Sequence, residues 1–148
     1  MLRIAALFSL ALILAPSNGS AKDAPKRKIP CKTPAIAASC YWTHGRLGIY
    51  NGTPSYRLWK VGTNRLLGIY SGPSVYDGPL ASLYPLDNES PEFPANLYHT
   101  AWRAMAPNQI WPDVYADFEV CPLEPEKPGA MQAACIESAK NLFVDKLK

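Results

Sequence analysis

The amino-acid sequence predicts a mainly β protein: a small antiparallel barrel or sandwich, with an OB-like barrel as the first choice, one short helix and two disulfides. Three observations support this class. Turn residues divide residues 41–72 into three short runs that are rich in aromatic and branched side chains. Residues 114–121 alternate between apolar and polar side chains. Four cysteines, an even number, occur in a chain that begins like an exported protein.

Residues 1–21 have the layout of a secretory signal peptide. Arg3 precedes the apolar run IAALFSLALILA, and Gly19 and Ala21 stand at positions −3 and −1 of a cleavage site. The run is shorter than the roughly 20 residues that a membrane-spanning helix needs. We therefore expect cleavage and a periplasmic or secreted protein without stable membrane insertion, and an uncut N-terminal anchor is the alternative.

After the signal peptide we expect an extended lead-in, residues 22–39, and a single β-rich domain, residues 40–148. The formal net charge of the whole chain is only +3 at pH 7, whereas nucleic-acid binders carry a concentrated basic face. We therefore expect no nucleic-acid partner. The basic cluster from Lys26 to Lys28 lies in the lead-in, where it is either a solvated tail or a point of attraction for an anionic membrane or polymer.

The cysteines indicate disulfides rather than a metal site. They are Cys31, Cys40, Cys121 and Cys135. Of the three pairings that four cysteines allow, we expect Cys31–Cys40 and Cys121–Cys135, because each pair is close in sequence and flanks a plausible loop. A zinc site needs closely spaced ligand pairs, but the chain has no C-x-x-C and its histidines, His44 and His99, lie far apart. We therefore expect no metal and no other cofactor.

Three short strands are expected at residues 41–50, 55–62 and 65–72. The dipeptide Asn51-Gly52 is a strong turn signal between the first two. Connections this short do not cross over to a parallel neighbour, so antiparallel pairing is expected.

The first and third of these strands contain a repeat. RLGIYNGTPSY and LLGIYSGPSVY begin at Arg46 and Leu66, and both place a glycine, Gly48 or Gly68, between apolar residues. Glycine weakens a strand unless the chain bends there or another group approaches closely. Two units are fewer than a repeat architecture needs. The repeat is therefore interpreted as two strands with the same chemical requirement, with a duplicated unit or paired binding surface as the alternative.

A proline-rich insertion, residues 73–112, is expected to be mostly loop, because proline is excluded from central strands. Within it, residues 90–105 predict one helix, with Ser90 as its cap and Pro91 at its first helical position. The residues expected to form its buried stripe are Phe93, Leu97, Ala101 and Met105.

The last third of the chain predicts a strand, a turn and a returning strand. The strand at residues 114–121 is expected to turn one set of side chains inward, namely Val114, Ala116, Phe118 and Val120. Residues 122–129 form a proline-stiffened turn, and residues 131–139 return as a strand. Residues 141–147 are expected to add one more short strand or a final turn.

Two segments resemble a group of small exported bacterial proteins that have no known activity. The segments are GRLGIYNGTPSYRLWKVGTNRLLG and DFEVCPLEPEKPGAMQAACIESA. The resemblance implies a bacterial, exported, disulfide-bearing domain. It implies no activity and transfers no catalytic residues.

The aromatic residues of the first three strands indicate a binding surface. Its expected residues are Tyr50, Tyr70, Arg46, Arg57 and Trp59. Tyrosine and tryptophan offer large contact areas with a polar tip, and arginine adds charged hydrogen bonds. We therefore expect a non-catalytic binding or structural module whose partner is a cell-envelope glycan or an exported protein. In the alternative reading, the aromatic side chains fill the core.

Two other functions stay open. The sequence lacks a G-x-S-x-G nucleophile motif, but His44 with Asp117 or Glu119 is a candidate base for a small hydrolase. The proline-stiffened loop at residues 122–129 is a candidate inhibitory loop for a secreted enzyme, because rigidity lowers the entropy lost on binding.

Overall fold

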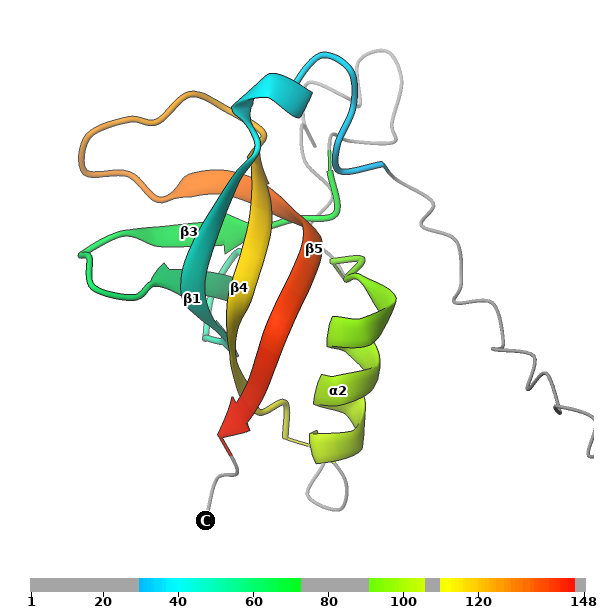
Figure 1. The fold of residues 1–148 in the computed structure, drawn as a ribbon. Coiled ribbons are helices and arrows are strands. Elements are labelled where there is room, and N and C mark those ends of the chain that lie inside the picture. The colour runs from blue at the N-terminus through cyan, green and yellow to red at the C-terminus, as the bar shows by residue number, and fades with distance from the viewer. Residues whose placement is uncertain (1–29, 73–90, 106–109, 146–148) are drawn as a thin grey trace, which may run out of the picture.

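A computed structural model describes residues 30–72, 91–105 and 110–145, which form a barrel with a helix on its side (Figure 1). The expected signal peptide, the basic cluster and most of the proline-rich insertion lie outside the described residues. In the described part, the mainly β class with one short α-helix and two disulfides is confirmed.

The sheet closes into a barrel with the strand order β1-β2-β3-β5-β4, so the barrel is the correct one of the two predicted architectures. The elements are η1 (Ala37–Ser39), β1 (Tyr41–Ile49), β2 (Tyr56–Lys60), β3 (Leu66–Ile69), α2 (Ala95–Met105), β4 (Asp113–Pro122) and β5 (Gln132–Asp145). Closure removes free sheet edges, because every strand has two neighbours.

The barrel is mixed, which departs from the fully antiparallel prediction. β3 pairs in parallel with β5, and all other pairs are antiparallel. A parallel pair needs a long crossover connection, and the chain from β3 to β5 supplies one that includes α2 and β4. The strand expected at residues 131–139 does not end before residues 141–147, where a further short strand or a final turn was expected, but continues as one strand, β5, to Asp145.

The sequence repeat corresponds to two strands that flank the same neighbour. Gly48 of β1 and Gly68 of β3 both lie opposite Arg57 of β2 in register. A Cβ atom on Gly68 would lie 2.6 Å from Pro54 Cγ, and one on Gly48 would meet the Asp113 carboxylate. Both glycines therefore leave room for a group packed on the outside of the sheet, which supports a shared strand requirement.

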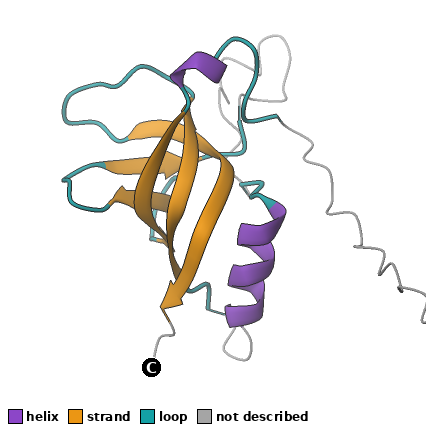
Figure 2. Ribbon diagram, in the orientation of Figure 1, coloured by secondary structure: helices purple, strands orange, loops and turns teal. Residues whose placement is uncertain are grey.

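The core lies inside the barrel and beneath α2. The four inward residues predicted for β4 are all buried, and Phe118 is the largest fully buried side chain. The helix lies beside β5 (Figure 2) and packs on it through Leu97 and Ala101. Asn96 Nδ2 donates a hydrogen bond of 2.6 Å to the Ala139 carbonyl. The helix begins at Ala95, later than predicted, and the expected cap Ser90 lies outside the described residues.

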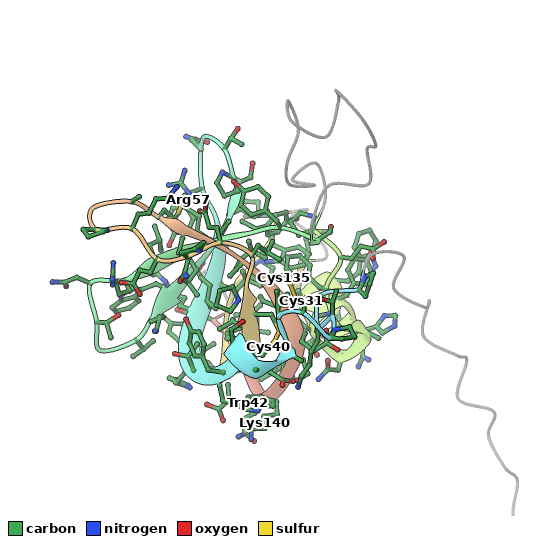
Figure 3. All side chains as sticks on the ribbon, turned by 90° about the horizontal axis from the view of Figure 1, so that it is seen from above. Cys31, Cys40, Trp42, Arg57, Cys135 and Lys140 are labelled. Atoms are coloured by element: carbon green, nitrogen blue, oxygen red, sulfur yellow. A yellow bond between two sulfur atoms is a disulfide. The ribbon has the colours of Figure 1, made fainter. Side chains whose placement is uncertain are left out.

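The predicted disulfide pairing is wrong, because Cys31 bonds to Cys135 (Figure 3) and Cys40 bonds to Cys121. Cys121 and Cys135 lie opposite each other on β4 and β5. The short segment before β1 passes over this pair of strands and contributes one cysteine to each. Closeness along the chain therefore gave the wrong partners, since the strand register decides which thiols meet.

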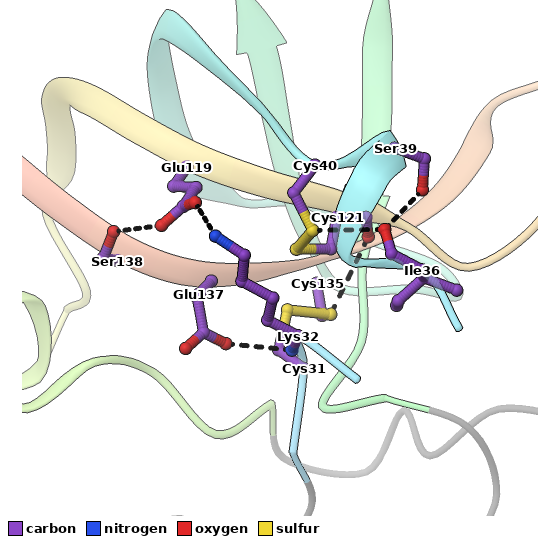
Figure 4. Close-up of a disulfide and its surroundings, with 10 residues drawn as sticks. All are labelled: Cys31, Lys32, Ile36, Ser39, Cys40, Glu119, Cys121, Cys135, Glu137 and Ser138. Atoms are coloured by element: carbon purple, nitrogen blue, oxygen red, sulfur yellow. Dashed lines mark hydrogen bonds and ion pairs between the residues drawn. A yellow bond between two sulfur atoms is a disulfide. The ribbon is translucent and has the colours of Figure 1, made fainter. Parts of the chain in front are cut away.

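Lys32 also connects the segment before β1 to the barrel, through a hydrogen bond and an ion pair (Figure 4). Its Nζ lies 2.6 Å from Glu119 Oε1, and its backbone N–H donates to Glu137 Oε2 at 3.0 Å. Ser138 Oγ donates to the other Glu119 oxygen at 2.8 Å. The hydrogen bonds from Lys32 and Ser138 hold the pKa of Glu119 below its ordinary value. Residues 30–39 thus cover one end of β4 and β5.

Loss of either disulfide is expected to destabilise the barrel strongly. The bridges join residues separated by 104 and 81 positions, and closing loops of this length contributes about 4–5 kcal/mol each in the chain-entropy account. The double variants Cys31→Ser/Cys135→Ser and Cys40→Ser/Cys121→Ser should each lower the free energy of unfolding in urea by roughly that amount. Non-reducing peptide mapping checks the connectivity, and a fragment that joins Cys31 to Cys40 contradicts it.

Candidate functional site

Four of the five predicted binding residues come together on the outer face of β1 and β2. We call Arg46, Tyr50, Arg57 and Trp59 the Arg–aromatic array. The Arg46 guanidinium lies 5.5 Å from the Trp59 ring centre, and Arg57 lies 5.4 Å from the Tyr50 ring centre. Arg46 Nη2 also donates a hydrogen bond of 3.0 Å to the Tyr50 hydroxyl. Cations over ring faces attract the ring quadrupole, so the four side chains stabilise one another.

The array is also tied to the backbone around it. Arg57 donates from Nε to the Pro54 carbonyl at 3.1 Å and from Nη2 to the Asn51 carbonyl at 3.0 Å. Trp59 Nε1 donates to the Thr63 carbonyl at 2.7 Å. These bonds fix the loops at both ends of β2, so the array has a structural role and a fixed geometry.

Tyr70, the fifth predicted residue, is held on another part of the barrel. It follows β3, and its backbone N–H donates to the Ala134 carbonyl of β5 at 2.9 Å. Its side chain is half-buried, and burial, followed by the nearby Glu124 carboxylate, raises the pKa of its hydroxyl. None of the contacts described for Tyr70 reaches the array.

A second polar cluster lies across β1, β4 and β5. His44 Nδ1 lies 3.0 Å from Asp117 Oδ1, and Asn141 Nδ2 donates to Asp117 Oδ2 at 2.7 Å. The hydrogen bond from Asn141, followed by that from His44, holds the pKa of Asp117 below its ordinary value. Of the two carboxylates predicted as partners for His44, Asp117 makes the contact, whereas Glu119 is engaged by Lys32 and Ser138.

Asn141 reaches Asp117 because β5 contains an irregularity at this point. The register shifts between Tyr115 and Asp117, and Asn141 has a positive φ of 54°. Asparagine is one of the few residues other than glycine that adopts this left-handed conformation readily. A bulge of this kind redirects a side chain while the strand continues. Sequence reasoning missed this residue, and the signal was a polar asparagine inside an otherwise strand-like run.

Beside this cluster is a groove of about 470 Å³, here called the β5 groove. It is lined by His44, Tyr115, Asn141, Phe143 and Asp145. Phe143 is 65% exposed, and its ring centre lies 6.3 Å from that of Tyr115 with an angle of 55° between the ring planes. Sequence reasoning assigned no binding role to residues 141–147. The aromatic residues are concentrated in the first three strands, whereas this segment contains a single phenylalanine.

The loop proposed as an inhibitory segment, residues 122–129, joins β4 to β5 and is largely exposed. Glu126 pairs with Arg65 from the β2–β3 turn, and Glu124 Oε1 accepts the Ala133 N–H at 3.1 Å. In the part of the chain that is described, no group of histidine, cysteine or acidic residues forms a metal site. Within the same ranges, no helix has the length and apolar character required to cross a bilayer.

Asn141 has a left-handed backbone conformation, which is expected to limit the residues that can be substituted at this position. Asn141→Ala should be less stable than Asn141→Gly by about 1–2 kcal/mol, because only glycine adopts this conformation without steric cost. Both variants remove the amide that bonds Asp117, so the pKa of Asp117 should rise toward its ordinary value in both. Urea unfolding and NMR titration measure the two effects. Equal stability of the variants contradicts the backbone argument.

Comparison of the chain with protein-family models, with curated proteins and with solved structures finds no match.

Proposed function

We propose that the protein is an exported, non-catalytic binding module that recognises a cell-envelope ligand through the Arg–aromatic array. The observation that carries the proposal is the clustering of Arg46, Tyr50, Arg57 and Trp59 on one outer face of the barrel. Aromatic and arginine side chains are the residues most enriched at binding hot spots.

The array suits binding because its side chains are already held in place. Arg57 and Trp59 each bond to backbone carbonyls, so little rotamer freedom remains to be lost when a ligand binds. The two disulfides hold the barrel beneath. They also support export, because disulfides persist in oxidising compartments.

The charge of the array indicates the chemistry of the ligand. Arg46 and Arg57 bring two positive charges, and Asp113, whose Oδ2 lies 3.5 Å from Arg46 Nη1, is the carboxylate that contacts the array. A ligand with acidic groups beside an apolar surface fits this combination. An acidic envelope glycan and an acidic patch on an exported protein both have this chemistry.

Removal of one arginine is expected to weaken binding to acidic envelope material. Arg46→Gln should reduce the affinity for an acidic envelope polysaccharide or exported protein by about tenfold, since one charge-assisted contact is lost. Tryptophan fluorescence follows the titration, because Trp59 belongs to the array. The matched control is Arg103→Gln on α2, which removes an equal charge elsewhere. Equal affinity of the Arg46 and Arg103 variants contradicts the proposal.

A second candidate, a small hydrolase, is favoured by the contact between His44 and Asp117. With Asp117 bonded to Nδ1, the other ring nitrogen is placed to take a proton from water as that water attacks an ester carbonyl. Loss of a general base costs about 10²–10⁴-fold in rate. His44→Gln should therefore abolish hydrolysis of p-nitrophenyl esters, whereas equal rates for wild type and variant exclude this function.

A further inference from the structure

We propose that the β5 groove binds a neutral saccharide, with a sugar ring packed on Phe143 and its hydroxyl groups donating hydrogen bonds to acceptors on the groove wall. The groove lies on β1, β4 and β5, and the array lies on β1 and β2. The inference therefore goes beyond the function proposed for the array and does not depend on it.

The aromatic rings of the groove differ from the other aromatic rings on the barrel surface. Cations lie over the rings of Trp59, Tyr50, Tyr41 and Trp42, the last of which is covered by Lys140 at 4.1 Å (Figure 3). Among the described residues, no cation lies over the ring face of Phe143 or Tyr115, although Arg46 is hydrogen-bonded to the Tyr115 side chain. Phe143 is also the most exposed large apolar side chain in those ranges, at 65%. An exposed ring of this kind offers an apolar surface for the C–H face of a sugar.

The polar atoms of the groove are mostly hydrogen-bond acceptors. The pKa of Asp117 is held below its ordinary value, so at neutral pH its carboxylate is an acceptor, and its Oδ1 lies 3.0 Å from His44 Nδ1. Asn141 uses its amide nitrogen on Asp117, which leaves its Oδ1 as an acceptor. Asp145 adds a carboxylate to the lining.

An acceptor-rich wall selects a ligand that brings donors. Carboxylate and phosphate groups carry acceptors only and would face Asp145 with like charge. A neutral sugar supplies hydroxyl donors around an apolar ring face and avoids this repulsion. The volume of about 470 Å³ is within the range of small-ligand sites.

The test uses the oxidised full chain and two neutral tetrasaccharides, chitotetraose and cellotetraose. At least one should shift the amide NMR signals of His44, Tyr115 and residues 141–145. Phe143→Ala should weaken this binding by about tenfold, because the stacking surface is lost. The matched control is Trp102→Ala, which removes an exposed aromatic ring from α2 and should leave binding unchanged.

Three results would overturn the inference. The first is that neither tetrasaccharide shifts the groove signals. The second is that Phe143→Ala binds as tightly as wild type. The third is that tetragalacturonate or the cation tetramethylammonium binds the groove as well as the neutral sugars do. If the acidic envelope ligand still binds in an Arg46-dependent way, the proposed function stands while this inference fails.

Discussion

The antiparallel pairing of β4 with β5 is the contact on which the other features of the molecule depend. It is the longest ladder in the barrel, running from Asp113 opposite Asp145 to Pro122 opposite Ala134. At one end it places Cys121 beside Cys135, so that the segment before β1 is bonded to both strands. Near its middle it brings Asp117 close to Asn141. Its inner side supplies Phe118 to the core, and α2 packs on β5.

Closure of the barrel depends on the two strands that carry the repeat. β1 and β3 lie on either side of β2, and each places a glycine opposite Arg57. The glycines admit the Asp113 side chain and the Pro54 ring, which would otherwise collide with a Cβ atom. The common sequence therefore reflects a common steric requirement on two sides of one strand. β3 then meets β5 in parallel, which completes the cylinder.

The array and the β5 groove are neighbours because of strand β1. Arg46 of the array lies opposite Tyr115 in register, and Tyr115 lines the groove. The two surfaces nevertheless differ in chemistry. The array presents guanidinium groups over aromatic rings, whereas the groove presents an uncovered phenylalanine and hydrogen-bond acceptors. The outer face of a single small barrel thus carries two regions of different chemistry.

The sequence by itself determined the mainly β class, the inward face of β4, the helix and the presence of two disulfides. Strand alternation, turn residues and an even cysteine count are local signals, and each follows from the chemistry of adjacent residues. Clustering of Arg46, Arg57 and Trp59 was also predictable, because short turns place neighbouring strands side by side.

Only the tertiary structure decided which cysteines pair, that β3 runs parallel to β5, and that Tyr70 lies apart from the array. It also decided that Asn141 joins His44 and Asp117 beside Phe143. These features depend on strand register and on a bulge, where a shift of one residue changes every contact across the sheet. Such contacts join residues far apart in the chain, so no local pattern in the sequence encodes them.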